Sequence, residues 1–262
     1  MLPRSVVPER RTAPAWRRPA QTALDRTRST PAKEPTLSAH RAEPPAFPGR
    51  FTASGVFVCF EGGDGSGKST QSHALAEWVR AEGFRPLLTF EPGDTPVGRL
   101  LRSIVLSPET GALADRTESL LYAADKAEHV ETVVLPALER GEVVITDRYV
   151  DSTLAYQGAG RALQLSDVEW VARWATHDLR PHLTVLLDLA PTSGLGRFEE
   201  RDRIEGESME FHERVRAGFL AMADADPDHY LVLDARLPVA DISAAVRERT
   251  RPFLAQAERV AT

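Results

Sequence analysis

The 262-residue sequence contains a single cysteine, Cys59, so no disulfide can form within the chain. It has no apolar run near the roughly 20 residues that a membrane-spanning helix requires. Its N-terminal region also lacks the hydrophobic segment of a secretory signal peptide. These absences argue against a disulfide-stapled fold and a membrane partner, and we expect a cytoplasmic protein.

Basic residues are outnumbered by acidic residues beyond the N-terminal region. Residues 1–50 contain 10 Lys and Arg against 4 Asp and Glu, whereas the whole chain has a net charge of −6. The remainder of the chain is therefore acidic and offers no broad basic face to a nucleic-acid backbone. We expect no nucleic-acid partner, although a few arginines can still bind a small anionic ligand.

The first residues have the composition of a disordered segment. Of the 19 prolines in the chain, 9 fall within residues 1–50, with no sustained apolar period among them. Such a segment buries too little surface to offset the entropy lost on ordering. We predict a disordered extension over 1–54 and a folded domain over 55–258. Alternatives for the extension are a transit peptide, which its prolines disfavour, and weak nucleic-acid contact.

The stretch FVCFEGGDGSGKST, residues 57–70, carries the clearest functional signal. The short run 56–60 is apolar and rich in β-branched and aromatic residues, which predicts a buried strand. The pattern Gly-x-x-x-x-Gly-Lys-Ser follows, and residues 71–82 have apolar positions at helical spacing. A strand before this pattern and a helix after it are the context of a phosphate-binding P-loop. We therefore predict a protein that handles ATP or GTP.

The chemistry of this loop follows from its glycines. They let successive backbone N–H groups point inward, where the helix N-terminus adds partial positive charge. Lys68 would reach the β- and γ-phosphates, and the Ser69 hydroxyl would ligate Mg²⁺. The predicted ATP-binding residues are Gly62, Gly63, Asp64, Gly65, Ser66, Gly67, Lys68, Ser69 and Thr70.

Further short strands alternate with helices along the chain. Strands are predicted at 85–90, 142–147, 183–189 and 230–234, and helices at 97–106, 117–140, 166–176, 209–223 and 239–257. This order predicts an α/β fold, a five-stranded parallel sheet with helices on both faces. Right-handed crossovers bring the P-loop, residues 91–96 and Asp147 to the carboxyl edge of the sheet. A carboxylate at Asp147, at a strand end, is placed to steer Mg²⁺.

Two helices carry more detailed predictions. Ser166 is predicted as an N-cap, with Glu169 as the matching acid of a capping box. Residues 117–140 carry an apolar stripe that fits either a core or a dimer contact. The stripe consists of Leu120, Leu121, Ala124, Ala127, Val130, Val134 and Leu138, and Tyr122, Asp125, Lys126 and His129 lie off it.

P-loop proteins include kinases, GTPases, motors and translocating ATPases. The sequence has no Asn-Lys-x-Asp motif of the kind that reads a guanine base. Small nucleotide kinases instead carry their own arginines on a segment that closes over the phosphates. The charge-dense residues 197–205 are placed for that role, with Arg201 and Arg203 as the candidate arginines. A solvated helix end is the alternative.

Six motifs occur in one order. They are EGGDGSGKSTQ (61–71), EPGDTP (91–96), LYAADK (121–126), DRY (147–149), STLAYQG (152–158) and DRIE (202–205). Together they resemble the thymidylate kinase family, whose members phosphorylate dTMP to dTDP with ATP and Mg²⁺. The resemblance covers residues 55–256, and family members form homodimers through helices that flank the acceptor site.

The resemblance implies roles for individual residues. Lys68 would contact the transferred phosphoryl group, Asp64 would lie between the acceptor's sugar and phosphate, and Ser69 and Asp147 would hold the metal. The implied acceptor-binding residues are Glu91, Pro92, Arg102, Tyr122, Lys126, Arg148, Ser152, Tyr156 and Gln157. The family's catalytic groups correspond to Asp64, Lys68 and Arg148, and to Arg201 and Arg203 in the closing segment.

Four positions depart from the family's usual residues, and Tyr122, which stands where a phenylalanine is usual, is the mildest change. Asp94 stands where a glycine is common, and Phe90 replaces an arginine, so the loop becomes more negative near an anionic acceptor. Lys126 replaces an arginine that hydrogen-bonds the base, and lysine makes no planar bidentate contact. These departures leave open a kinase for another nucleotide or nucleoside. A non-catalytic ATP-binding regulatory protein is the third alternative.

Overall fold

The computed structural model describes residue 52 and residues 54–194 and 202–259. The predicted disordered extension over 1–54 falls outside the described residues except for Thr52 and Ser54. Arg197 and Arg201 of the predicted closing segment also lie outside them, whereas Arg203 is described.

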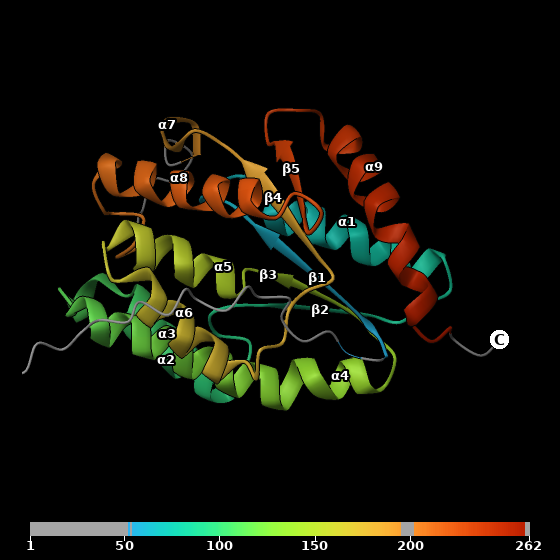
Figure 1. Ribbon diagram of the computed structural model, residues 1–262, viewed down its shortest axis with the longest axis horizontal. Coiled ribbons are helices and arrows are strands. Elements are labelled where there is room, and N and C mark those ends of the chain that lie inside the picture. The colour runs from blue at the N-terminus through green and yellow to red at the C-terminus, as the bar shows by residue number, and fades with distance from the viewer. Residues whose placement is uncertain (1–51, 53, 195–201, 260–262) are drawn as a thin grey trace, which may run out of the picture. The chain divides into compact units, whose positions relative to one another are not determined.

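A parallel sheet organises the described part of the chain (Figure 1). Its strands are β1 (Val56–Glu61), β2 (Pro86–Phe90), β3 (Val143–Asp147), β4 (Leu183–Asp188) and β5 (Tyr230–Asp234). They lie in the order β2-β3-β1-β4-β5, and every neighbouring pair is parallel. The predicted five-stranded parallel sheet is confirmed, with the P-loop strand at its centre.

Helices connect these strands. They are α1 (Lys68–Ala81), α2 (Pro96–Leu106), α3 (Asp115–His129), α4 (Leu135–Glu139), α5 (Val150–Thr153), α6 (Leu165–Ala175), α7 (Pro191–Gly194), α8 (Met209–Ala225) and α9 (Val239–Thr250). Residues Val130–Val134 and Leu154–Gly160 are π-helical, and Pro108–Thr110 and Arg251–Gln256 are 3₁₀-helical. Among the described residues, no helix combines the length and apolar character needed to cross a membrane.

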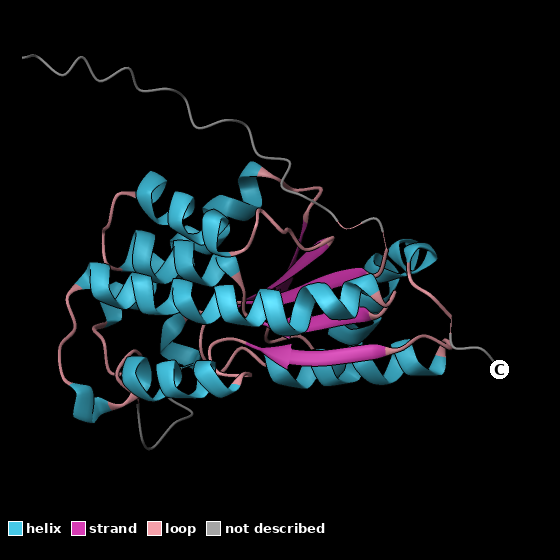
Figure 2. Cartoon of the chain, turned by 90° about the horizontal axis from the view of Figure 1, so that it is seen from below, coloured by secondary structure: helices cyan, strands magenta, loops and turns pink. Residues whose placement is uncertain are grey.

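Both faces of the sheet are covered by helices, as predicted (Figure 2). Side chains alternate along β1, so Val58 packs with α1 and α9 on one face, while Phe57 packs with α4 and the preceding π turn on the other. Cys59 is 1% exposed and belongs to the second cluster, where it acts as a small core residue. Central strands buried on both faces explain why β1 is a continuous apolar run.

The long helical stretch over 115–139 contains one π turn, Val130–Val134, which the sequence did not reveal. The Leu135 N–H bonds to the Val130 carbonyl, five residues back. Pro136 has no N–H to donate to the Thr132 carbonyl, so the ordinary ladder is interrupted there. The extra residue rotates the helix face.

This rotation divides the predicted apolar stripe. Val130, Val134 and Leu138 are fully buried, whereas Leu120 is 58% exposed. Three polar residues that lie off the stripe, Asp125, Lys126 and His129, are instead buried in the protein. The stripe is therefore core at its C-terminal end and a surface feature at its N-terminal end.

Three helix boundaries differ from the prediction. The capping box in α6 was wrong: the N-cap is Gln164, and Ser166 lies inside the helix. Burial of Val168, Ala172 and Ala175 sets the start of α6, because packing outweighs a cap worth about 1 kcal/mol. Helix α1 begins at Lys68, since Gly67 adopts a left-handed conformation. Helix α9 ends at Thr250, ahead of Pro252.

Candidate active site

The P-loop joins β1 to α1 at the carboxyl edge of the sheet. Gly62 has φ +134°, and a Cβ there would overlap the Leu187 carbonyl oxygen of β4. Gly67 has φ +92° and is the N-cap of α1, whose first turn contains no acidic residue. The loop therefore needs glycine at these two positions, and free N–H groups of the α1 N-terminus face the edge of the sheet.

Lys68 lies inside the loop. Its side chain is buried, and Nζ donates a hydrogen bond to the Gly63 carbonyl oxygen at 3.0 Å. Burial and the nearby Arg148 cation lower the pKa of Lys68 from its ordinary value. Both effects outweigh the nearby carboxylates of Asp147, Asp64 and Glu61, so the ammonium group is destabilised in the free protein and the position is suited to a phosphate group.

Ser69 and Asp147 meet across the loop. The Ser69 hydroxyl donates to Asp147 Oδ2 at 2.7 Å, so the P-loop serine touches the carboxylate at the end of β3. Hydroxyl and carboxylate oxygens are the donors that Mg²⁺ prefers. These two residues fit a magnesium ion that completes its shell with water and phosphate oxygens.

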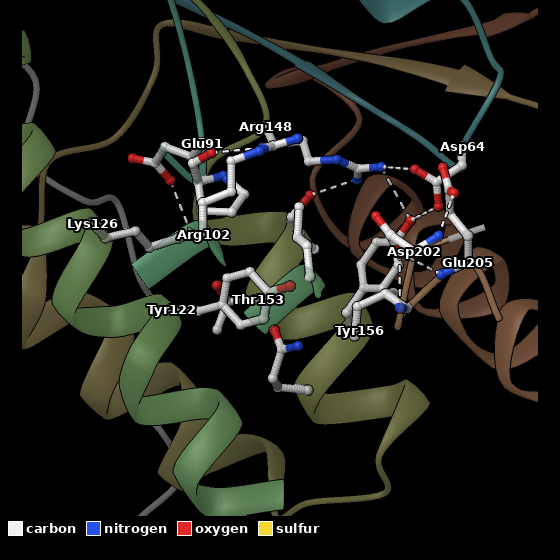
Figure 3. Close-up of a pocket in the computed structure, with 15 residues that line it drawn as sticks. Asp64, Glu91, Arg102, Tyr122, Lys126, Arg148, Thr153, Tyr156, Asp202 and Glu205 are labelled. Carbon is white, nitrogen blue, oxygen red and sulfur yellow. Dashed lines mark hydrogen bonds and ion pairs between the residues drawn. The ribbon is translucent and has the colours of Figure 1, made fainter. Parts of the chain in front are cut away.

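Arg148 connects the P-loop to the neighbouring pocket (Figure 3). Its Nη2 donates to Asp64 Oδ1 at 2.6 Å, and its Nη1 donates to Ser152 Oγ at 3.1 Å. The Tyr156 hydroxyl donates to Asp64 Oδ2 at 3.2 Å. Burial alone would raise the pKa of Asp64, but Arg148 and Lys68 outweigh it and hold the pKa below its ordinary value. Asp64 is therefore a carboxylate held in place by a cation.

Glu61 is a buried carboxyl group behind Arg148 that sequence reasoning left without a role. Its Oε1 accepts from the Tyr149 and Ser152 N–H groups at 2.8 and 3.0 Å, and its Oε2 accepts from the Ser152 hydroxyl at 2.6 Å. Burial and the neighbouring Asp151 raise its pKa to about 7. Glu61 thus fixes the start of α5 and the hydroxyl that Arg148 contacts. Only its position in the P-loop motif could have indicated it.

Two cavities meet at Asp64 and Arg148. One, of about 550 Å³, is lined by P-loop residues and Asp147. The other, of about 150 Å³, lies between α3, α5 and the segment 202–205. Both cavities are also lined by Glu91 and Arg102. The arrangement offers one place for a triphosphate and an adjoining place for a second, smaller substrate.

The structure brings the predicted acceptor residues together around the smaller cavity. Glu91, Pro92, Arg102, Tyr122, Lys126, Arg148, Ser152, Tyr156 and Gln157 all line it. Figure 3 shows Tyr122 and Lys126 entering from α3, with Asp64, Asp202 and Glu205 on the opposite side. The cavity combines aromatic rings with fixed hydrogen-bonding groups, which is the composition of a small-molecule site.

The floor of this cavity differs most from what the sequence suggested. Lys126 Nζ lies 2.9 Å from Glu91 Oε2, and His129 Nδ1 lies 2.8 Å from Glu91 Oε1. All three side chains are at most 2% exposed. Burial would raise the pKa of Glu91, but Lys126 and the hydrogen bond with His129 keep it below its ordinary value. His129 is a site residue that the sequence analysis missed.

Arg102 lies at the entrance shared by the two cavities. Its Nη1 donates to the Pro92 carbonyl oxygen at 2.7 Å, and its guanidinium lies 5.8 Å from the centroid of the Phe90 ring. Its charge is thus held in place without a carboxylate partner among these contacts. The resemblance implied that this arginine binds the acceptor, and it lies in the walls of both cavities.

Arg203 is held away from the P-loop. Its Nη2 lies 2.6 Å from Glu118 Oε2, and its Nε donates to the Val105 carbonyl oxygen at 2.8 Å. Glu118 also accepts from Gln157 at 3.0 Å and from Arg161. Glu118 therefore anchors the segment 202–205 to α3, a role that no sequence motif indicated. The catalytic role predicted for Arg203 stays a prediction.

The central P-loop strand, the contact between Ser69 and Asp147 and the smaller cavity beside the P-loop are the fold and the site of a P-loop kinase. A family model described as thymidylate kinase matches residues 60–246. The thymidylate kinase of Cutibacterium acnes is 54% identical over 200 residues, covering 76% of this chain and 98% of the relative. That of Clavibacter michiganensis subsp. michiganensis is 50% identical over 206 residues, covering 77% and 97%.

A solved structure agrees with these relatives. The crystal structure of thymidylate kinase from Ehrlichia chaffeensis matches with a TM-score of 0.60 and 30% identity, over 74% of this chain and 98% of that one. The chain belongs to the thymidylate kinase family.

Proposed function

We propose that the chain transfers the γ-phosphoryl group of ATP to dTMP, the reaction of the thymidylate kinase family. The observation that carries this proposal is the meeting of a P-loop cavity and a smaller cavity at Asp64 and Arg148. Two substrates bound in these cavities would bring their phosphates together beside a buried arginine and a P-loop lysine.

The chemistry requires positioning and charge neutralisation rather than a strong base, because an acceptor phosphate oxygen is already nucleophilic. We assign the ATP phosphates to the loop Gly62–Thr70, with Lys68 at the transferred group. Arg148 would hold the acceptor phosphate, with Asp64 orienting its guanidinium through the 2.6 Å contact.

Mg²⁺ is assigned to Ser69 and Asp147, whose oxygens lie 2.7 Å apart. Ser69 and Asp147 would hold the ion, which would supply neutralisation of the charge that develops during transfer. The residues of the chain supply two oxygen donors and leave the other positions to water and phosphate.

The acceptor nucleoside is assigned to the smaller cavity. Tyr122 would stack on the base, and Lys126, held by Glu91 at 2.9 Å, would donate to a base carbonyl oxygen. Arg102 would share the acceptor phosphate with Arg148. The remaining contacts are assigned to Pro92, Ser152, Tyr156 and Gln157.

The remaining catalytic charge is assigned to the arginines of the closing segment. Residues 65 and 66 of the P-loop are glycine and serine, so the loop itself supplies no arginine. Arg201 and Arg203 are the candidates. To contact a phosphate, Arg203 would have to leave Glu118, whose Oε2 lies 2.6 Å from its Nη2. We therefore favour Arg201 as the catalytic arginine.

We also propose a homodimer. Large apolar side chains are exposed on α2, α3 and α6, and these helices pack side by side, with α3 in the middle (Figure 1). Leu100 is 68% exposed, Leu120 58%, Trp170 67% and Trp174 73%. A surface of this kind beside the acceptor cavity suits a second copy of the chain.

The test is ADP release with ATP and Mg²⁺ against dTMP, dUMP, dCMP, dGMP, UMP and thymidine. We expect a strong preference for dTMP. Activity confined to another acceptor would retain the kinase but overturn the assigned base contacts of Tyr122 and Lys126. ATP binding without acceptor-dependent ADP release would favour a regulatory protein.

A further inference from the structure

Five side chains form an unbroken chain of contacts beneath the acceptor cavity, which we call the floor chain: Asp94, Thr89, His129, Glu91 and Lys126. Asp94 Oδ2 lies 2.5 Å from Thr89 Oγ1, and Thr89 Oγ1 lies 2.6 Å from His129 Nε2. His129 Nδ1 lies 2.8 Å from Glu91 Oε1, and Glu91 Oε2 lies 2.9 Å from Lys126 Nζ. The floor chain thus joins Asp94 and Lys126, two of the positions that depart from the family's usual residues.

The floor chain is almost wholly enclosed. Thr89, Glu91, Lys126 and His129 are each at most 3% exposed, and only Asp94 is half-buried, beside the P-loop cavity. Buried polar groups must satisfy one another, because no bulk water is present to do so. The contacts within the floor chain therefore determine which of its atoms must carry a proton.

The first proton to assign lies between Glu91 and His129. The Glu91 carboxyl group faces the Lys126 ammonium through Oε2 at 2.9 Å and His129 Nδ1 through Oε1 at 2.8 Å, which is the setting of a carboxylate. A carboxylate only accepts hydrogen bonds, so His129 Nδ1 must carry a proton and donate it. Both Glu91 oxygens are then occupied, one by each cationic partner.

The second proton to assign lies between Thr89 and its two partners. Its hydroxyl has one hydrogen but two close partners, Asp94 Oδ2 and His129 Nε2. One of these partners must therefore donate to it. A carboxylate oxygen only accepts hydrogen bonds, whereas an imidazole nitrogen can carry a proton and donate it; His129 faces Glu91, and Asp94 is half-buried beside the P-loop cavity. The proton belongs on Nε2, and Thr89 donates to Asp94.

We propose that His129 is a doubly protonated imidazolium ion that Asp94 maintains through Thr89, and that it positions Lys126 by fixing Glu91 beneath the acceptor base. His129 and Asp94 are then positioning residues, and this part of the proposal rests on the base contact assigned to Lys126. The charge of Asp94 is neutralised within the cavity wall instead of repelling the acceptor phosphate.

The floor chain explains how the protein accommodates Asp94 and Lys126, which depart from the family's usual residues. The floor chain holds two negative and two positive charges, so the added carboxylate of Asp94 is balanced by His129. The flexible stem of Lys126 is restricted because Glu91 cannot turn away from it while His129 holds the other oxygen. Asp125 is also close, and its Oδ1 accepts from the Gly93 N–H at 3.0 Å.

The charge state can be tested directly by ¹⁵N NMR of histidine-labelled protein at pH 7. The His129 signal is identified by its loss in His129→Gln. We expect both ring nitrogens of His129 to show the imidazolium signature, and Asp94→Asn to restore a neutral ring, because an Asn amide can donate to Thr89 itself. A neutral His129 ring in the unsubstituted protein would overturn the proposal.

The positioning role is tested by kinetics. His129→Gln reaches only one of its two partners, and we expect it to raise the KM for dTMP about tenfold with kcat changed less than about twofold. Loss of folded enzyme would lower kcat at unchanged KM, and that result would overturn the positioning role. His177→Gln is the matched control, since His177 pairs with Glu131 on the surface at 3.1 Å and should leave both constants unchanged.

A double variant separates this proposal from the function on which it rests. Lys126→Met should raise the KM for dTMP, and adding His129→Gln should raise it little further, because both act through one contact. Fully additive effects would overturn the positioning role. If Lys126→Met leaves KM unchanged, the base contact of Lys126 and the positioning role fail together, while the NMR spectrum still decides the charge of His129.

Discussion

The P-loop end of the active site and the floor of the acceptor cavity both place a carboxylate against a hydrogen-bond donor, but the two contacts are specified differently. At the P-loop end, Ser69 and Asp147 meet because parallel register places the end of β3 beside β1. At the floor, Lys126 and Glu91 meet only because α3 packs its polar side against the loop after β2.

The difference follows from what each end would bind. A phosphate presents the same oxygens in every nucleotide, so backbone N–H groups of a glycine loop suffice and local sequence specifies them. A base must be distinguished by side chains, and side chains can change in groups. Lys126 and Asp94 belong to one such group, since the floor chain connects them.

The largest loss is expected from Lys68→Ala. Removing the cation from the P-loop should lower kcat at least about a hundredfold, since no other described group occupies the position beside Gly63. Thermal unfolding should be little changed, because the Lys68 ammonium is desolvated at a cost in the free protein. Coupled ADP release measures the turnover, and Arg80→Ala, at an exposed position of α1, is the control. Near-normal turnover would contradict the P-loop assignment.

Arg148→Ala should cause a similar but separable loss. We expect at least about a hundredfold lower kcat/KM with dTMP, because Arg148 is the group at which the two cavities meet. Arg148→Lys should recover little, since an ammonium cannot contact Asp64 and Ser152 as a planar fork does. Full recovery by lysine would show that charge alone is required, and the two ends of the site would then differ less than we infer.

Asp125→Asn should alter stability in a pH-dependent way at the floor. Burial and Glu91 raise the pKa of Asp125 to about 6 from 3.8, so the folded state binds its proton more tightly than the unfolded state. This contribution to stability is complete below about pH 4 and is lost as the pH rises through 6. The variant should equal the unsubstituted protein near pH 4 and exceed it at pH 7.5 by at most about 3 kcal/mol.

Urea unfolding of both proteins at the two pH values measures this difference, and subtraction removes the other titrating groups. An equal difference at both pH values would show that folding does not shift the pKa of Asp125, and it would contradict the raised pKa.

The smallest catalytic effect is expected outside the cavities. Leu120→Glu places a charge at the centre of the apolar surface on α3, where Leu120 is 58% exposed. It should convert a dimer to a monomer, as measured by sedimentation, with kcat changed only a few-fold. Glu131→Gln, on the exposed side of the π turn, is the control. A dimer that persists in Leu120→Glu would exclude this surface as the contact.

Local sequence determined the order of strands and helices, the P-loop and the placement of Asp147 and Arg148 at the same edge. Each of these depends on residues close together in the chain or on the handedness of strand connections, so short-range chemistry is sufficient. The family's acceptor residues were also recognisable, because their spacing along α3 and α5 repeats a known pattern.

Tertiary structure alone decided how those residues are used. Lys126, His129 and Asp125 lie off an apolar stripe yet are buried, because a π turn at Val130–Val134 rotates the helix. Glu61 and Glu118 acquire their roles from partners dozens of residues away, Ser152 and Arg203. Pairing across such distances depends on how helices pack, and packing is a property of the whole core that no single stretch of sequence contains.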